Sequence, residues 1–129
     1  STDIFVSPNE NTDLIYEGDV VLIVSGSTVS AAEIFTITMA QLPQVSILGR
    51  PTSGEFSDIL ARKLPNGWRF GLSNEVYAAP DGTVYEIVGI PPDFLPEAEL
   101  LPLTELQRGE DSWLEAALEI AQMSSNTLD

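Results

Sequence analysis

The chain has 129 residues, 43% of them hydrophobic and 19% charged, a composition that predicts one folded domain and excludes a disordered segment. Its 20 acidic and 5 basic residues give a net charge of −15, which excludes nucleic acid and anionic membrane surfaces as partners because both need cationic side chains. Cysteine and histidine are absent, which excludes disulfides, thiolate chemistry and an imidazole base within these residues. No apolar run approaches the roughly 20 residues of a membrane span, so no membrane insertion is expected. Because the chain begins with Ser-Thr-Asp and not with Met, we expect it to be part of a longer one.

The first half of the chain predicts a strand, a helix and a second strand. Residues 1–18 are a turn-rich lead-in, in which Asp3–Val6 is expected to be a short strand. The apolar run 19–24, rich in β-branched residues, is typical of a strand buried on both faces of a parallel sheet. Apolar residues at helical spacing predict a helix over about 29–42 that is buried on all sides. A strand at 45–48 would complete a βαβ unit.

The segment that follows predicts antiparallel strands. They are expected at 58–64, 68–72, 75–79 and 83–88. The segments Pro65-Asn66-Gly67 and Pro80-Asp81-Gly82 are typical of hairpin turns between such strands. Trp68 and Phe70 would lie on one face of the second of these strands, which predicts that both belong to the core.

The C-terminal part predicts a connector and a closing helix. Two adjacent prolines exclude regular structure at 89–93, which ends the predicted core at 19–93. Residues 94–110 are expected to be a proline-containing connector. Residues 111–124 would form the closing helix, with an amphipathic pattern over Ser112–Met123. The side chains expected to pack this helix are Trp113, Leu114, Leu118 and Ile120.

The segment Gly26–Ile34 carries the candidate chemistry. Ser30 follows a buried strand and begins a helix, so its hydroxyl would lie beside free N–H groups at the positive end of the helix dipole. Such groups can stabilise an oxyanion, and several unrelated hydrolases present a nucleophile in this way. Ser30 and Glu33 also have the spacing of a capping box, which only satisfies helix N–H groups. Residues 112–115 repeat that spacing, so spacing alone leaves both interpretations open.

The segment Gly-Ser-Thr-Val-Ser-Ala-Ala-Glu-Ile-Phe resembles the nucleophile segment of the C-terminal-processing (tail-specific) serine peptidases, the S41 type, including their tricorn-core relatives. Three later segments resemble that family in the order that it predicts: Gly49–Gly54 its G-x-x-T-x-G loop, Leu64–Gly67 its L-P-[ND]-G turn, and Tyr85–Asp93 its G-[IV]-x-P-D end. The resemblance covers residues 20–122. It implies an α/β fold, with this chain as a fragment of a crotonase/ClpP-like ββα spiral that has a βαβ core and an antiparallel hairpin layer.

The resemblance also implies roles for individual residues. Ser30 would be the nucleophile, and the backbone N–H of Ala31 would donate to the oxyanion. Glu86 stands where the tricorn-like branch has a glutamate that assists a histidine, although a solvent-facing carboxylate is the alternative. The accessory candidates are Glu33, Thr52 and Ser53. The threonine and serine could line the substrate groove, but turn structure explains them equally well.

The match departs from the family at the general base. One branch has a lysine directly after the second glycine of G-x-x-T-x-G, where this chain has Glu55. The only lysine, Lys63, comes eight residues later, where a solvated strand face is expected. A serine hydroxyl is a weak nucleophile without an adjacent base. We therefore expect a histidine base, and a second oxyanion donor, from a segment upstream of Ser1.

The expected function is that of a serine peptidase of the C-terminal-processing type, which cleaves an extended polypeptide through an acyl-enzyme and is inactive as this chain alone. No metal or organic cofactor is implied. The alternative is a catalytically silent module that binds peptide ends or mediates assembly. A severed domain would expose apolar surface, so we also expect self-association, as in a homodimer. The resemblance implies an extracytoplasmic location, periplasmic or secreted.

Overall fold

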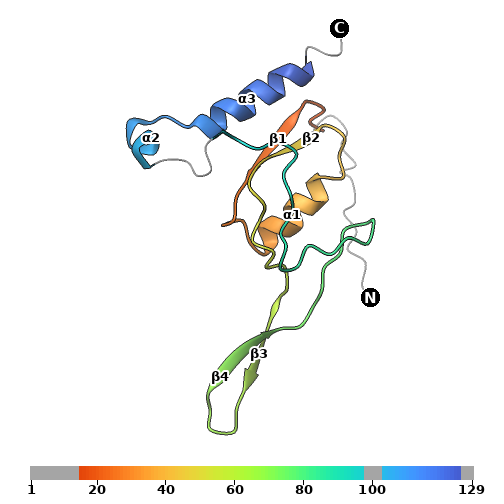
Figure 1. The fold of residues 1–129 in the computed structure, drawn as a ribbon. Helices are drawn as coiled ribbons and strands as arrows, with labels where there is room; N and C mark the ends of the chain where they lie inside the picture. Colours follow the sequence, from red (N-terminus) through yellow and green to blue (C-terminus); the bar gives the residue numbers. More distant parts are fainter. Residues whose placement is uncertain (1–14, 98–102, 126–129) are drawn as a thin grey trace.

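The computed structural model describes residues 15–97 and 103–125 (Figure 1). In chain order the elements are β1 (Val20–Val24), α1 (Ala31–Met39), β2 (Val45–Gly49), β3 (Ile59–Lys63), β4 (Arg69–Ser73), α2 (Leu103–Arg108) and α3 (Ser112–Ser125). Within these residues they form a small mixed α/β structure with two sheets of two strands each. The strand expected at Asp3–Val6 lies outside the described residues. The larger spiral that the resemblance implies stays a prediction.

The unit β1–α1–β2 confirms the predicted βαβ arrangement. The two strands pair in parallel, with Val20 opposite Val45 and Val24 opposite Gly49. Branched apolar side chains dominate β1, and such side chains favour extended backbone in a buried parallel sheet. In a parallel pair the carboxyl ends of both strands lie at the same edge. The turn after β1 and the loop after β2 therefore begin side by side.

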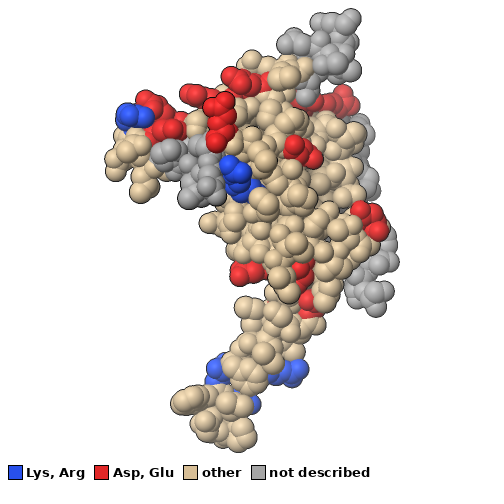
Figure 2. All heavy atoms as spheres, viewed as in Figure 1, with Lys and Arg blue, Asp and Glu red and all other residues tan. Residues whose placement is uncertain are grey.

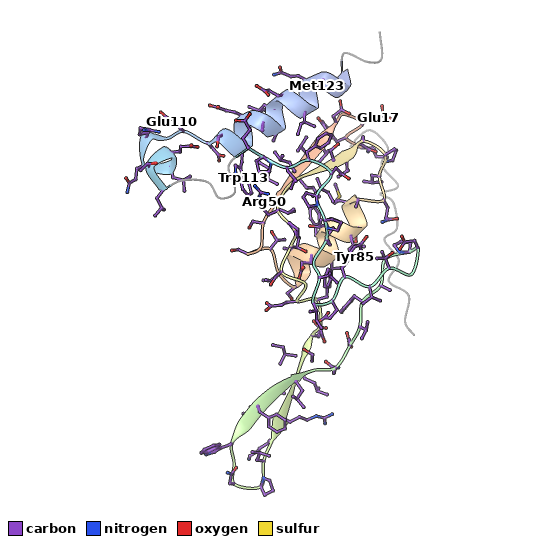
Figure 3. All side chains as sticks on the ribbon, in the orientation of Figure 1. Glu17, Arg50, Tyr85, Glu110, Trp113 and Met123 are labelled. Carbon is purple, nitrogen blue, oxygen red and sulfur yellow. The ribbon has the colours of Figure 1, made fainter. Side chains whose placement is uncertain are left out.

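The strand pair lies between α1 and α3 (Figure 1). The buried core cluster consists of Val24, Ile47, Phe56 and Ile90, with Ile34, Ile37, Tyr77 and Tyr85 packed against it. Ile34 and Ile37 bring α1 onto this cluster, and Figure 3 shows Tyr85 beside the same helix. On the other side α3 packs against both strands and buries Trp113 and Ala117. The loop residue Phe56 and the late residue Ile90 thus share one core with β1 and β2.

The predicted irregular segment at 89–93 is held along the free edge of β2. The carboxylate of Asp93 accepts a hydrogen bond of 2.8 Å from the N–H of Ile47. The N–H groups of Asp93 and Phe94 both donate to the carbonyl oxygen of Ile47, at 2.8 and 3.0 Å. Phe94 then forms a parallel bridge with Leu48. The segment thus ends in a single bridge to β2 and adds no strand to the sheet.

The strands β3 and β4 form an antiparallel hairpin that extends away from the rest of the structure (Figure 1). Its turn is at the predicted place, with the N–H of Gly67 donating to the carbonyl oxygen of Leu64 at 2.9 Å. The expectation that Trp68 and Phe70 belong to the core is wrong, because the hairpin contacts no second layer among the described residues. Trp68 is 72% exposed and Phe70 39%. The hairpin is therefore a two-stranded ribbon, and it does not form the predicted layer among the described residues.

The strands expected at 75–79 and 83–88 are absent from the described structure, which has turns and irregular backbone there. The Pro80-Asp81-Gly82 turn does form, since the N–H of Ala79 donates to the carbonyl oxygen of Thr83 at 2.8 Å. Neither flank of that turn is a strand in the described structure. The second arm turns again at 86–88 to reach the core, which prevents a continuous ladder.

The helices differ from the predicted ones in length and burial. α1 is shorter than 29–42 and is not buried on all sides, because Phe35 on its outer face is 55% exposed. α2 lies inside the segment that was expected to be a connector. α3 confirms the closing helix, but it packs along a single stripe. Leu114 and Leu118 therefore face outward, which corrects their expected burial, whereas Trp113 is buried as expected.

Candidate functional site

Ser30 has an unusual backbone conformation in the turn between β1 and α1. Its φ is 54° and its ψ is −123°, immediately before the first residue of the helix. An ordinary helix N-cap has extended backbone with negative φ. A positive φ in a residue with a Cβ costs free energy, and it persists only where the surrounding structure fixes it. Ser30 is also exposed, so a strained backbone presents its hydroxyl to solvent.

Ser112 provides an internal comparison, because it has the same Ser-x-x-Glu spacing. It is already the first residue of α3, and the helix is capped by Asp111, whose Oδ1 accepts from the N–H of Leu114 at 2.9 Å. Ser112 is not among the described residues with positive φ. Spacing alone left two interpretations of Ser30 open. The backbone conformation distinguishes Ser30 from the serine at the start of an ordinary helix.

Glu33 is fully buried beneath this turn, and three backbone N–H groups surround its carboxylate. Its Oε2 accepts from the N–H of Ser30 at 3.1 Å and from that of Glu55 at 2.9 Å. Its Oε1 accepts from the N–H of Gly54 at 2.7 Å. The position of Glu33 one turn into α1 directs the side chain back toward Ser30. The Ser30–Glu33 pair has the capping-box arrangement, but it also reaches a second segment.

That second segment, Thr52–Phe56, lies directly against the turn that contains Ser30. The N–H of Ser30 donates to the carbonyl oxygen of Glu55 at 2.9 Å, and the N–H of Ser53 donates to that of Thr28 at 3.0 Å. Ser53 is partly exposed, and its expected place in a substrate groove stays a prediction. Thr52 is only 4% exposed, and its hydroxyl accepts from the N–H of Ile90 at 2.7 Å. The side chain of Thr52 therefore links two loops.

Glu86 lies on the far side of the same segment. Its Oε2 accepts from the N–H of Phe56 at 3.3 Å, and the next residue, Ile87, donates its N–H to the carbonyl oxygen of Gly54 at 2.8 Å. Ile87 has a φ of 72°, and among the described residues only Ser30 and Ile87 are non-glycine residues with positive φ. The structure thus brings Ser30 and Glu33 into contact. It places Glu86 one loop away, with no hydrogen bond between Glu86 and Ser30 among the described residues.

The first turn of α1 has one N–H group suited to an oxyanion. The N–H groups of Ala32 and Glu33 donate to the carbonyl oxygens of Val29 and Ser30, at 3.1 and 2.9 Å. The N–H of Ala31, the first residue of the helix, precedes them in the turn where a helix lacks internal acceptors. Ala31 is exposed. A charge that develops beside the Ser30 hydroxyl would meet this N–H and the positive end of the helix dipole.

The described residues provide no general base next to Ser30. Glu55 contributes main-chain atoms to the site, and its side chain is exposed. Lys63 is the last residue of β3, opposite Arg69 on the projecting hairpin, and is exposed as expected. Over 15–97 and 103–125, no group of three or more acidic, cysteine or histidine side chains could hold a metal ion. In the same part of the chain, every helix is too short or too polar to cross a membrane.

Sequence reasoning missed the residues that join the loops. Phe56 anchors the Thr52–Phe56 segment in the core, and Ile90 holds Thr52. The residue type at position 87 does not predict the positive φ of Ile87, since β-branched residues avoid that region of backbone conformation. The glycine spacing around it, Gly54 and Gly89, is the only feature of the sequence that points to close backbone packing there.

Comparisons with known proteins show which family and which folds the chain resembles. The model of peptidase family S41 matches residues 3–95. A crystal structure of a candidate peptidase from Parabacteroides merdae ATCC 43184 superposes with a TM-score of 0.76 and 26% identity, covering 92% of this chain and 36% of that one. A lipoprotein from Streptococcus agalactiae is 30% identical with a TM-score of 0.52, covering 76% and 32%. The photosystem II D1 C-terminal processing protease is 26% identical with a TM-score of 0.53, covering 69% and 23%.

Among curated proteins, none matches the chain. The chain spans about a third of the length of the Parabacteroides protein and of the streptococcal lipoprotein.

Proposed function

Because the chain belongs to peptidase family S41, a family of serine peptidases, we propose that it is the nucleophile-bearing part of such an enzyme, with Ser30 as the nucleophile. The backbone of Ser30 is the observation that carries this proposal. A serine that merely capped α1 would need no positive φ, and Ser112 shows how an ordinary helix start looks in the same chain. Strain at an exposed hydroxyl supports a functional role for Ser30.

In the proposed reaction the Ser30 Oγ attacks the carbonyl carbon of a peptide bond while a general base takes its proton. The resulting oxyanion accepts a hydrogen bond from the N–H of Ala31. The base then gives the proton to the leaving amine, the carbon–nitrogen bond breaks, and an acyl-enzyme remains on Ser30. Water hydrolyses this ester by the same route in reverse, which releases the new carboxyl terminus. The substrate is an extended polypeptide.

The general base is supplied by residues outside these 129. The sequence has no histidine, and its single lysine, Lys63, is on the projecting hairpin. In this proposal Glu86 orients the incoming histidine. Its hydrogen bond to the N–H of Phe56, in the loop that also contacts Ser30, supports that role. This assignment makes Glu86 a partner of the base and not of the serine hydroxyl. The chain by itself should then be inactive.

A second function from another class is a catalytically silent module that binds peptide ends or mediates assembly. The specific observation in its favour is Glu55, which stands at the position where one branch of the family has its lysine. A silent module would keep the fold and the strained turn but leave the Ser30 hydroxyl without activation.

Fluorophosphonate labelling of the full-length natural protein, mapped by mass spectrometry, separates the two functions. The peptidase predicts one labelled serine, Ser30, and no label after Ser30→Ala. Ser27→Ala is the matched control, because Ser27 is an exposed serine in the same turn. The extent of labelling at Ser30 in the Ser27→Ala variant should equal that in the wild type. A folded wild-type protein that takes no label at Ser30 would reject the peptidase and leave the silent module.

We also propose that the chain associates with a second copy of itself through the β3–β4 hairpin. The hairpin carries three of the five basic residues and, between Ile59 and Ser73, no acidic one. Figure 2 shows basic side chains on the projecting hairpin and acidic ones spread over the body. Exposed strand edges and apolar side chains such as Trp68 favour such a contact. For the location, membership of the family supports an extracytoplasmic site.

A further inference from the structure

We infer that Glu33 is a positioning residue that holds Ser30 in its strained conformation by tying it to the loop at Gly54 and Glu55. The inference rests on the proposed function of Ser30. Glu33 touches neither substrate nor base in this arrangement, since its carboxylate is fully buried and occupied by backbone donors. It acts on the reaction through the geometry of Ser30.

The burial of this carboxylate is compensated only in this one arrangement of segments. A buried carboxylate is costly unless hydrogen bonds replace its hydration. Here Oε2 accepts from two N–H groups, of Ser30 and Glu55, and Oε1 from a third, of Gly54. Bonds to a charged acceptor are about twice as strong as neutral ones. If the loop moved away, the carboxylate would lose two of its three donors.

The same network fixes Ser30 from both sides. Its N–H is shared between the Glu33 carboxylate at 3.1 Å and the carbonyl oxygen of Glu55 at 2.9 Å. Its carbonyl oxygen accepts from the N–H groups of Glu33 and Ile34, at 2.9 and 3.1 Å. The two peptide groups that flank the strained Cα are thus both held. A misplacement of about 1 Å at a nucleophile can cost about 100-fold in rate.

The test is Glu33→Gln in the full-length natural protein, measured by the kinetics of fluorophosphonate labelling at Ser30. A glutamine keeps the shape of the side chain but replaces one accepting oxygen with an NH₂ group. It must therefore point donors at the N–H of Gly54 or at those of Ser30 and Glu55. We expect the maximal labelling rate to fall about 100-fold. The probe concentration that gives half this rate should stay unchanged, because the buried Glu33 side chain does not contact the probe.

Glu119→Gln is the matched control, because it removes one negative charge from an exposed residue of α3 that has no contact with the Ser30 turn among the described residues. Its labelling should stay within about twofold of the wild type. The folded fraction of each variant comes from urea denaturation. Hydrogen exchange at Gly54 and Glu55 should speed up in Glu33→Gln only, which reports the loosened loop directly.

Three results distinguish failure of the proposed function from failure of the inference about Glu33. If Ser30 of the wild-type protein takes no label, both the proposed function and the inference are rejected. A labelled wild type with an equally labelled Glu33→Gln variant overturns the inference alone. A decrease that merely follows the lost folded fraction also overturns it, because Glu33 would then be a structural residue without influence on Ser30.

Discussion

The side-chain oxygen of Thr52 accepts a hydrogen bond of 2.7 Å from the backbone N–H of Ile90, and the N–H of Thr52 donates to the carbonyl oxygen of Ile90 at 3.2 Å. Residues 38 positions apart are thus paired at the base of the candidate site. The pair holds the loop that contacts Ser30 against the segment that follows Glu86.

Thr52→Val should destabilise the protein by about 1–3 kcal/mol, because it leaves the buried N–H of Ile90 without its acceptor. Valine keeps the shape of threonine, so lost packing does not explain the result. The free energy of unfolding in urea measures the change. Thr52→Ser retains the hydroxyl and should recover most of the loss. If Thr52→Val has the same free energy of unfolding as the wild type, water replaces the hydroxyl as the acceptor for the N–H of Ile90.

Gly89→Ala should be much more destabilising than Gly67→Ala. Both glycines have positive φ, 78° and 91°, so both substitutions incur the same kind of backbone strain. At Gly89, however, a Cβ would overlap the carbonyl oxygen of Thr52, whereas at Gly67 nothing lies within 4 Å. We expect the two free energies of unfolding to differ by more than about 2 kcal/mol. Equal losses would mean that the contact between the two loops is loose.

Ile87→Asn should stabilise the protein by about 1 kcal/mol, because asparagine tolerates a positive φ better than a β-branched residue. Ile87 is 90% exposed, so little packing is lost. Val88→Asn is the control, since Val88 is also exposed but has no positive φ. Thermal unfolding of both variants compares them. A loss of stability in Ile87→Asn would show that the isoleucine is covered in the full-length protein.

The βαβ unit was predictable because its signals are local. The apolar run of β1 and the proline after the helix indicate the elements without knowledge of any partner. The exposure of Trp68 and Phe70 was not predictable, because alternation shows which face a side chain occupies but not whether a second layer covers it. The prediction of strands at 75–79 and 83–88 failed for a related reason. A segment pairs as a strand only where a neighbouring strand lies in the right register.

The association of Ser30 with Glu33 was predictable, whereas the backbone geometry of Ser30 was not. Resemblance identified Ser30 and Glu33 as belonging together, and the structure joins them by a hydrogen bond. The positive φ of Ser30 could not be derived from serine, which has no preference for that region. It arises from contacts with Glu55, 25 residues later in the chain, which no local pattern encodes. The roles in catalysis remain predictions.

Charge reversal of the hairpin should abolish self-association. Lys63 and Arg69 face each other across β3 and β4. The double substitution Lys63→Glu and Arg69→Glu therefore reverses the charge of one cross-strand pair. Sedimentation velocity should show dimers of the wild-type chain at low salt, fewer at high salt, and monomers of the double variant. Arg108→Glu is the control outside the hairpin and should keep the dimer. A wild type that is monomeric at every concentration would contradict the proposal.

The turn at Asp81 should weaken in acid. The N–H of Thr83 donates to Oδ1 of Asp81 at 2.8 Å, and this bond lowers the pKa of the carboxyl below its ordinary 3.8. A lowered pKa in the folded state means that the stabilisation is complete above the ordinary value and is lost as the pH falls through the lowered one. Carbon-13 NMR of the carboxyl against pH measures the midpoint. Asp81→Asn, which keeps the acceptor, should lack this pH dependence of stability.

Glu55 joins the site through its main chain, with the N–H bound to Glu33 and the carbonyl oxygen to Ser30, while its side chain is exposed. Any residue except proline can supply those two groups, so this position can change in evolution without disturbing Ser30. It is also where one branch of the family has its lysine. A lineage could therefore exchange an internal base for one brought by another segment through changes at a single tolerant position, with the loop intact before and after.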